Sequence, residues 1–161
     1  RDTLFADTTR ACAALPAELR AAIAGRVALH VYRSRRAGAV VQTRSAEEQA
    51  ESPPARHPLI RLHPQTGAEA VYLNPNRIER IEGLPLDEGD ALLDRLLAHC
   101  TRPQHVYRHS WRLGDVVIWD NRCTMHKASS DYGDEPRRML RILIEGTRPV
   151  GADAQRVTAV H

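Results

Sequence analysis

Cysteine and long apolar runs are scarce in this sequence of 161 residues, and each scarcity excludes a class of protein. The three cysteines lie far apart and form no C-x-x-C pair, so their spacing supports neither a disulfide framework nor a zinc finger. No apolar run approaches the ~18 to 20 residues that a membrane-spanning helix needs, and no signal-peptide pattern opens the chain. We therefore expect a protein of the reducing cytoplasm, with no membrane segment.

An excess of charge of one sign is also lacking. The chain has 23 basic and 20 acidic residues, which gives a net charge of +3, and Lys127 is its only lysine. The arginines are scattered along the chain, whereas proteins that bind nucleic acid gather basic residues on one face. We expect no nucleic-acid partner, and the preference for arginine is typical of a bacterium with a GC-rich genome.

The composition is that of a single globular domain. Hydrophobic residues make up 42% of the chain and charged residues 27%, and 161 residues are enough to bury one core. Apolar residues recur at helical spacing over residues 7–24, where Pro16 suits the first turn of a second helix that Gly25 ends. A further helix is expected over residues 86–99, because its leucines fall on one face.

Short strand-like runs fill much of the remaining sequence. The pattern predicts one hairpin, in which residues 58–63 and 69–73 flank a turn at 64–67. It also predicts three further strands, at residues 104–112, 115–119 and 138–145, the first two joined tightly through residues 113–115. Few helices among many short strands indicate a mainly β sandwich or barrel with flanking helices.

One long polar segment interrupts this pattern. Residues 34–56 are rich in Arg, Ser, Glu, Gly and Pro, and only Val40 and Val41 form an apolar pair within them. This composition favours a mobile loop or lid over a buried element.

The residues with the clearest chemical potential lie in the last third of the chain. Residues 114–126 read GDVVIWDNRCTMH, and the terminal His126 precedes Arg137 by 11 residues and Arg141 by 15. A neutral imidazole is a good ligand for Fe(II), and a guanidinium presents a planar fork that binds a carboxylate through two hydrogen bonds. Arg141 follows Arg137 by four residues, so in a strand both side chains point to the same face.

Plainer interpretations of these arginines exist. Arg137 sits beside Arg138 in an arginine-rich chain, where a surface arginine is common. Arg141 would also fit a salt bridge at a sheet edge, for example with Glu145.

The spacing of these residues resembles the C-terminal signature of the Fe(II)/2-oxoglutarate dioxygenases of the taurine dioxygenase and 2,4-dichlorophenoxyacetate dioxygenase family. The resemblance implies a double-stranded β-helix, or jelly roll, in which His126 is the third iron ligand. It also implies that Arg137 anchors the carboxylate of 2-oxoglutarate and that Arg141 binds an anionic group of the substrate.

The start of the chain carries a second part of the resemblance. Residues 1–7 read RDTLFAD, which is similar to the family segment whose threonine helps to bind 2-oxoglutarate, and this assigns Thr3 to the cosubstrate. The family's other two iron ligands form a His-x-Asp pair ahead of that threonine, and no His-x-Asp occurs in this chain. We therefore expect residues 1–161 to be the C-terminal portion of a single dioxygenase domain, with a jelly roll that is incomplete at its N-terminus.

The resemblance implies an oxygenase that uses Fe(II), 2-oxoglutarate and O₂ and releases succinate and CO₂. The expected substrate is a small organic anion, such as an aryloxyalkanoate, an alkylsulfonate or a taurine-like compound, and the expected assembly is a homo-oligomer. A non-catalytic, truncated or degenerate family member is the alternative, because one histidine cannot hold Fe(II) alone. A hydrolase that uses Cys123 is a third hypothesis, although no residue is identifiable that would orient His126 as its base.

Other polar residues near the signature carry weaker signals. His105 and His109 share a face of the strand expected at 104–112, but no carboxylate accompanies them at ligand spacing. Trp119 and Asp120 are expected to shape and brace the site.

Overall fold

The computed structural model describes residues 2–38, 45–50, 52–129 and 138–152. Within these residues the strands form three antiparallel sheets of three strands each, with the orders β7-β1-β8, β3-β2-β6 and β5-β4-β9. The strands are β1 (Asp2–Asp7), β2 (Val27–His30), β3 (Ala55–Pro58), β4 (Ile60–Leu62), β5 (Glu69–Val71), β6 (Ile78–Ile81), β7 (Val106–Ser110), β8 (Thr124–Ala128) and β9 (Val150–Gly151).

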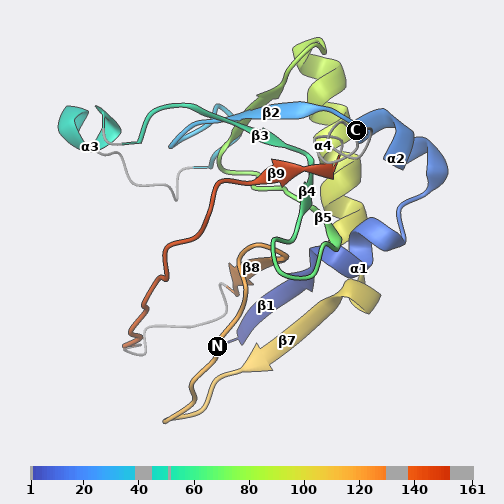
Figure 1. Ribbon diagram of the computed structural model, residues 1–161. Coiled ribbons are helices and arrows are strands. Elements are labelled where there is room, and N and C mark those ends of the chain that lie inside the picture. The colour runs from blue at the N-terminus through green and yellow to red at the C-terminus, as the bar shows by residue number, and fades with distance from the viewer. Residues whose placement is uncertain (1, 39–44, 51, 130–137, 153–161) are drawn as a thin grey trace.

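Helices flank these sheets. They are α1 (Thr8–Ala13), α2 (Ala17–Ile23), α3 (Ala46–Ala50) and α4 (Leu86–Cys100), with a short 3-10 turn, η1 (Pro103–His105), before β7. In Figure 1 the sheet of β2 and β3 lies at the top, the sheet of β1 and β7 at the bottom, and β4, β5 and β9 between them. The long helix α4 stands beside β6 and α1, and α1 in turn contacts β5 and β8, so the two helices link the three sheets (Figure 1).

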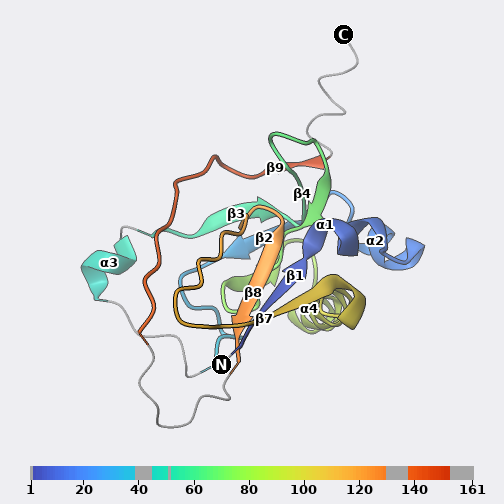
Figure 2. The same cartoon turned by 90° about the horizontal axis from the view of Figure 1, so that it is seen from below.

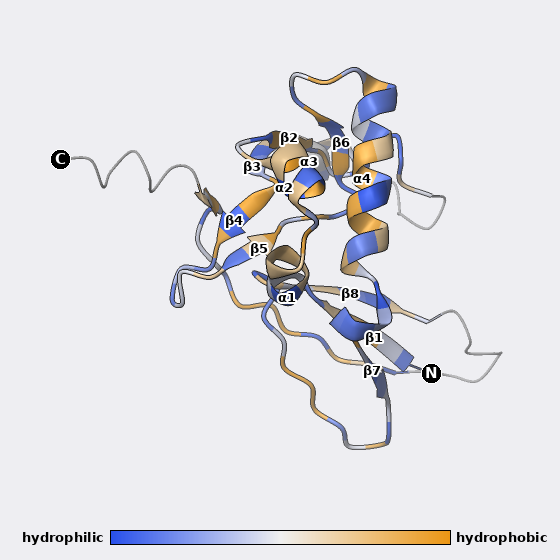
Figure 3. Ribbon diagram, turned by 90° about the vertical axis from the view of Figure 1, so that its right-hand side faces the viewer, coloured by the Kyte–Doolittle hydropathy of each residue, from blue (hydrophilic) through white to orange (hydrophobic). Residues whose placement is uncertain are grey.

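The core lies between α4, α1, α2 and the strands beside them. Leu92, Leu93 and Leu96 form the buried face of α4 and pack in the same cluster as Ile78 and Ile81 of β6. This confirms the helix predicted over residues 86–99. Figure 3 shows the same amphipathic pattern as alternating hydrophobic and hydrophilic bands along α4.

The other helices and the predicted hairpin are also confirmed. The expected helical region over residues 7–24 contains α1 and α2, and Pro16 is the residue directly before α2. Strands β4 and β5 pair antiparallel, with Ile60 opposite Val71, and the turn between them contains Gly67 at φ +69°. A positive φ is costly for residues with a Cβ, which explains glycine at this turn position.

Two predicted strands are wrong. Residues 115–119 and 138–145 are extended chain without strand pairing, and β7 is confined to Val106–Ser110, so no hairpin follows it. In Figure 2 the red segment that ends in β9 runs apart from the strands until it reaches β4. A strand requires a neighbour that accepts and donates its backbone hydrogen bonds, and none lies beside these two segments in the described part of the chain.

The segment predicted as a loop at residues 34–56 is more structured than its composition indicates. It contains α3 and the first residues of β3, while residues 39–44 and 51 lie outside the described ranges. Its beginning is tied to α4, because Arg35 donates two hydrogen bonds to Asp90, at 2.8 and 2.5 Å, and Arg36 forms an ion pair with Asp94. Its role as a lid stays a prediction.

The mainly β architecture with a few helices is confirmed, whereas the jelly roll stays a finer expectation. Among the described residues, no helix combines the length and the apolar character that crossing a bilayer requires.

Candidate functional site

Strand β1 brings two of the predicted site residues onto one sheet face. Thr3 lies opposite His109 of β7, and Phe5 lies opposite both Tyr107 of β7 and His126 of β8. Directly opposite residues share a face, and so do residues two apart in one strand. The side chains of Thr3, Phe5 and His126 therefore emerge from the same face of the sheet, although about 120 residues separate the first from the last in the sequence.

Two aromatic rings pack against His126, which is otherwise exposed. Its ring centroid lies 5.1 Å from that of Trp119 and 6.4 Å from that of Phe5, and the rings of Phe5 and Trp119 are 5.2 Å apart. This packing partly desolvates the imidazole and lowers the pKa of His126, and the nearby charge of Arg141 lowers it further. A lowered pKa keeps the ring neutral at pH 7, which is the form that binds a metal ion.

Thr3 is held in place by a tryptophan. Its side chain is buried, with 6% of the residue exposed, and its hydroxyl accepts a hydrogen bond of 2.9 Å from the indole N–H of Trp111. A threonine hydroxyl that accepts one hydrogen bond still has its own proton to donate. The Thr3 hydroxyl therefore keeps a proton that it can donate to another group.

Of the two predicted arginines, only Arg141 lies within the described residues. Arg137 lies outside the described residues. Arg141 is exposed, and its charge reaches His126. Within the described part of the chain no ion pair joins Arg141 to Glu145, which removes support from the salt-bridge interpretation.

The structure adds a carboxylate beside His109 that the sequence did not indicate. The Nε2 atom of His109 lies 3.1 Å from a carboxylate oxygen of Asp115, and its ring packs edge-on against Trp111 at 4.6 Å. His105, expected on the same strand, instead ends η1 and is buried. Because Trp111 also donates to Thr3, the Asp115–His109 contact supports the Thr3 end of the face.

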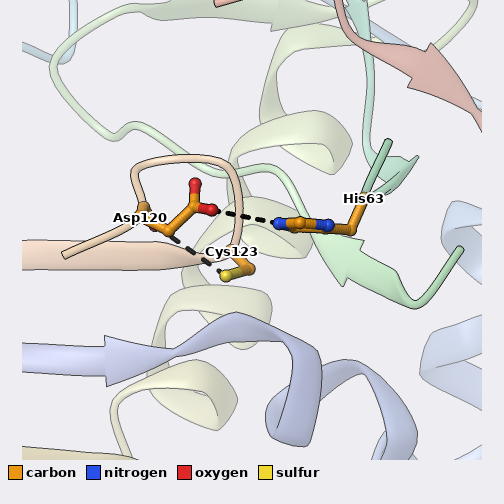
Figure 4. A group of neighbouring side chains, drawn as sticks. All are labelled: His63, Asp120 and Cys123. Atoms are coloured by element: carbon orange, nitrogen blue, oxygen red, sulfur yellow. Dashed lines mark hydrogen bonds and ion pairs between the residues drawn. The ribbon is translucent and has the colours of Figure 1, made fainter. Parts of the chain in front are cut away.

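A second polar group braces the turn that leads into β8. The Nε2 atom of His63, on the β4–β5 turn, lies 3.0 Å from the Asp120 carboxylate (Figure 4). Arg122 donates to both oxygens of the same carboxylate. Cys123 donates through its thiol to the backbone oxygen of Asp120 at 3.8 Å. The backbone N–H of Thr8 donates to Cys123 O at 2.9 Å, so this turn is fixed to both β4–β5 and α1.

The ligand atoms of His63, Asp120 and Cys123 lie within 4.8 Å of one another, which raises the question of a metal site. Arg122 donates to both Asp120 oxygens and, with His63, lowers the pKa of this carboxyl, so its charge is already neutralised. Burial and the Asp120 charge raise the pKa of the Cys123 thiol. A protonated thiol is a poor metal ligand and a poor nucleophile, so this group braces the turn, and the Cys123 hydrolase hypothesis loses support.

A cavity of about 760 Å³ adjoins the aromatic face. Phe5 and Trp119 line one part of it, and His63 and Asp120 line another. Thr3 and His126 do not line it, whereas Phe5 and Trp119, whose rings pack against the imidazole of His126, do.

Comparison with known proteins assigns the family. The taurine catabolism dioxygenase TauD, TfdA family matches residues 2–143. The chain is 37% identical over 140 residues to the alpha-ketoglutarate-dependent 2,4-dichlorophenoxyacetate dioxygenase of Cupriavidus pinatubonensis. The matched residues are 87% of this chain and 48% of that protein. It is 42% identical over 99 residues to the alpha-ketoglutarate-dependent sulfate ester dioxygenase of Pseudomonas putida, which covers 62% of this chain and 33% of that protein.

Solved structures agree with this assignment. The crystal structure of AAD-2 in complex with Mn(II) and N-oxalylglycine matches with a TM-score of 0.81 at 35% identity, over 92% of this chain and 58% of that one. A Burkholderia xenovorans structure described as an alpha-ketoglutarate-dependent 2,4-D dioxygenase matches with a TM-score of 0.70 at 38% identity, over 78% of this chain and 48% of that one. The chain spans about half the length of the curated relatives it matches. With its family signature on β1 and β8, the chain belongs to the TauD/TfdA family of dioxygenases.

Proposed function

We propose that this chain forms the C-terminal part of an Fe(II)- and 2-oxoglutarate-dependent dioxygenase that hydroxylates a small organic anion. One observation carries the proposal: Thr3 and His126 share a face of the β7-β1-β8 sheet, and the charge of Arg141 reaches His126. The relatives named as alpha-ketoglutarate-dependent dioxygenases support the same reaction class.

The donor chemistry around His126 fits iron in part. A neutral imidazole beside aromatic rings suits Fe(II), whereas within the described residues no group of three histidine, cysteine or carboxylate ligands includes His126. A facial triad on this domain therefore needs two ligands from polypeptide other than these residues. Our proposal is that a His-x-Asp pair ahead of Thr3 in the parent protein supplies them, as the resemblance implies.

Each residue of this face has a separate task in the proposal. His126 supplies one nitrogen ligand, and Thr3 donates its hydroxyl proton to the carboxylate of 2-oxoglutarate that Arg137 clamps. Arg141 binds the anionic group of the substrate and holds the carbon to be oxidised near the metal. Bound Fe(II), with 2-oxoglutarate and O₂, supplies the oxidising chemistry, and succinate and CO₂ are released.

The substrate class follows from charge and from the relatives. An exposed guanidinium beside His126 selects a carboxylate, sulfonate or sulfate ester, because these anions match its planar donors. The relatives' names include phenoxyacetate and phenoxypropionate, which are carboxylates, and sulfate ester. We accordingly propose a small aryloxyalkanoate, alkylsulfonate or related sulfate ester.

The test requires the parent protein that contains these residues and the sequence ahead of them. Metal binding is measured by anaerobic calorimetry with Mn(II), and turnover is measured as succinate formation with Fe(II), 2-oxoglutarate and O₂. Both assays should give a strong signal in the wild type and none in His126→Ala. His57→Gln, a change on β3 in a different sheet, is the matched control and should keep both signals. Equal metal binding by His126→Ala would refute the ligand assignment.

The alternative is a non-catalytic family member. It predicts that the parent protein carries no His-x-Asp pair ahead of Thr3 and binds Mn(II) no better than His126→Ala does. Reading the parent sequence and the same calorimetry therefore separate the two functions.

A further inference from the structure

A group of basic and aromatic side chains surrounds Tyr72, away from the β7-β1-β8 sheet. The guanidinium carbon of Arg61 lies 5.2 Å from the centre of the Tyr72 ring, and the His30 ring stacks on Tyr72 with centroids 5.3 Å apart. The ring of His57 lies edge-on to both, 5.3 Å from Tyr72 and 4.9 Å from His30. Strands of two sheets thus bring three basic side chains around a single aromatic ring.

Arg61 is buried without a carboxylate partner. Only 4% of the residue is exposed, and within the described residues no acidic group lies at ion-pair distance from its guanidinium. Asp120 influences Arg61 through space, but its oxygens are taken by Arg122 and His63. Burying an unpaired guanidinium is costly, so such a residue normally contacts an anion.

Polar atoms without partners gather at this group. The Nε atom of Arg61, Nε2 of His30 and Nδ1 of His57 are all buried, and none has a hydrogen-bond partner among the residues that the structure describes. Most buried polar atoms in folded proteins are paired, so three unpaired nitrogens around one ring are unusual. An oxyanion would accept from the Arg61 donor and from whichever histidine nitrogens carry protons.

Two members of the group reach the protein surface. His57 and Tyr72 are half-buried, whereas Arg61 and His30 are buried. The exposed Arg148 is close enough for its charge to lower the pKa of His57, after the larger effect of burial. Positive charge therefore lies both inside the group and at its edge, which favours entry of an anion.

We infer that Arg61, His57 and His30 form a binding site for a small oxyanion, a carboxylate or sulfate, with Tyr72 as its aromatic floor. Neither the iron-binding role of His126 nor the tasks of Thr3, Arg137 and Arg141 use these residues. The site is therefore independent of the proposed function and would stand if that proposal failed.

The test titrates the 161-residue chain with sodium sulfate and, separately, with sodium acetate, while sodium chloride keeps the ionic strength constant. The readout is the ¹⁵N–¹H resonance of the arginine Nε–H groups. We expect one resonance to move along a saturable curve, and to be missing in Arg61→Gln. Tighter binding of sulfate than of acetate would identify a tetrahedral oxyanion as the ligand, and the reverse would identify a carboxylate; each outcome supports the site.

Matched variants make the result decisive. Arg102→Gln removes an exposed arginine and should leave the saturable curve unchanged. Arg61→Lys keeps the charge but loses the planar fork, so binding should weaken on the order of tenfold. If Arg61→Gln does not fold, His57→Gln takes its place and should weaken binding by a similar factor. The inference is overturned if the wild type responds no differently to sulfate or acetate than to chloride, or if the saturable curve persists in the folded Arg61→Gln variant.

Discussion

Two arginines four residues apart are expected to bind different anions. Losing a charge-assisted clamp on a carboxylate costs about 2 to 5 kcal/mol. In the parent protein, Arg137→Ala should therefore raise the Michaelis constant for 2-oxoglutarate by orders of magnitude. Arg141→Ala should mainly impair use of the anionic substrate and leave uncoupled consumption of 2-oxoglutarate detectable. Steady-state kinetics with each substrate varied in turn measure both effects.

Neighbouring changes serve as controls for this assignment. Arg138→Ala removes an exposed arginine from the same segment and should change neither constant by more than a small factor. Arg137→Lys should recover only part of the loss, because an ammonium group cannot reproduce the planar fork. Identical defects in the Arg137 and Arg141 variants, or a 2-oxoglutarate defect confined to Arg141, would show that the two roles are wrongly assigned.

The carboxylate of Asp120 should make the stability of the chain depend on pH. The hydrogen bonds from Arg122 and His63 lower its pKa in the folded state. A lowered folded pKa means that the stabilising contribution is present above the unfolded value of about 3.9 and is lost as the pH falls through the folded pKa. Asp120→Asn should lower the free energy of unfolding by about 1 to 2 kcal/mol at pH 7, since the pair is partly exposed.

Urea unfolding measured at several pH values tests this contribution. Below about pH 4 the difference between wild type and Asp120→Asn should shrink, because the Asp120 carboxyl of the unfolded chain takes up a proton there, while the folded carboxyl, with its lowered pKa, stays ionised. Glu145→Gln, a change at an exposed carboxylate, is the control and should show no comparable narrowing. A difference that is constant from neutral to acid pH would contradict the role given to the Arg122 and His63 contacts.

Some site residues could be identified from the local sequence, and others only from the fold. His126 and Thr3 were predictable because a local motif marks each of them, and the register of β1 then places both on one face. The Asp115 contact of His109 and the His63 contact of Asp120 were not predictable. The latter joins residues 57 positions apart, and only the packing of the β4–β5 turn against the start of β8 creates it.

At the scale of elements, one glycine offers a clear stability test. Gly89 lies inside α4, and a Cβ added there would sit 3.8 Å from Ile81 Cβ, an ordinary contact. Gly89→Ala should therefore raise the free energy of unfolding by about 0.5 to 1 kcal/mol, through the lower conformational entropy of alanine in the unfolded chain. Chemical denaturation followed by circular dichroism measures the change.

Gly67 provides the opposing control. No atom lies within 4 Å of a Cβ added at Gly67, but the φ of this residue is +69°, which alanine adopts only with strain. Gly67→Ala should therefore destabilise the chain although no atom obstructs the new methyl group. Stabilisation at both positions would mean that available space, and not backbone conformation, decides these substitutions.

The sequence predicted the helices, which have a clear periodic pattern, and the one hairpin with recognisable turn residues. It did not predict most strands whose partners lie far away in the sequence. The helices α1, α2 and α4 and the β4–β5 hairpin follow from local spacing and turn residues. The strands β1, β2, β6 and β8 are four to six residues long and went unpredicted, since so few residues carry little periodic signal. Conversely, residues 115–119 and 138–145 have the composition of strands but no partner in the described part of the chain.

At the scale of the whole molecule, these two extended segments leave apolar side chains in solvent. Ile118, Leu140, Ile142 and Ile144 are each about nine-tenths exposed, at 90%, 89%, 91% and 93%. Figure 3 shows hydrophobic residues along the loop that extends beyond β7, away from the other elements. Exposed apolar side chains on a segment without strand pairing are typical of an interaction surface.

We expect the 161-residue chain to self-associate through this surface, in keeping with the homo-oligomer expected from the sequence. Burying one leucine or isoleucine side chain contributes about 1.5 to 3 kcal/mol, which corresponds to roughly a tenfold or greater change in affinity. The double change Leu140→Glu and Ile144→Glu should therefore weaken association by at least two orders of magnitude. Its cost to folding should be small, because neither side chain is buried in the core. Thr147→Glu adds the same charge on the same segment without removing an apolar group, and should have little effect. Sedimentation velocity over a range of protein concentrations decides the question: a wild type that stays monomeric throughout, or a double variant that associates as strongly as Thr147→Glu, would show that these side chains do not hold the copies together.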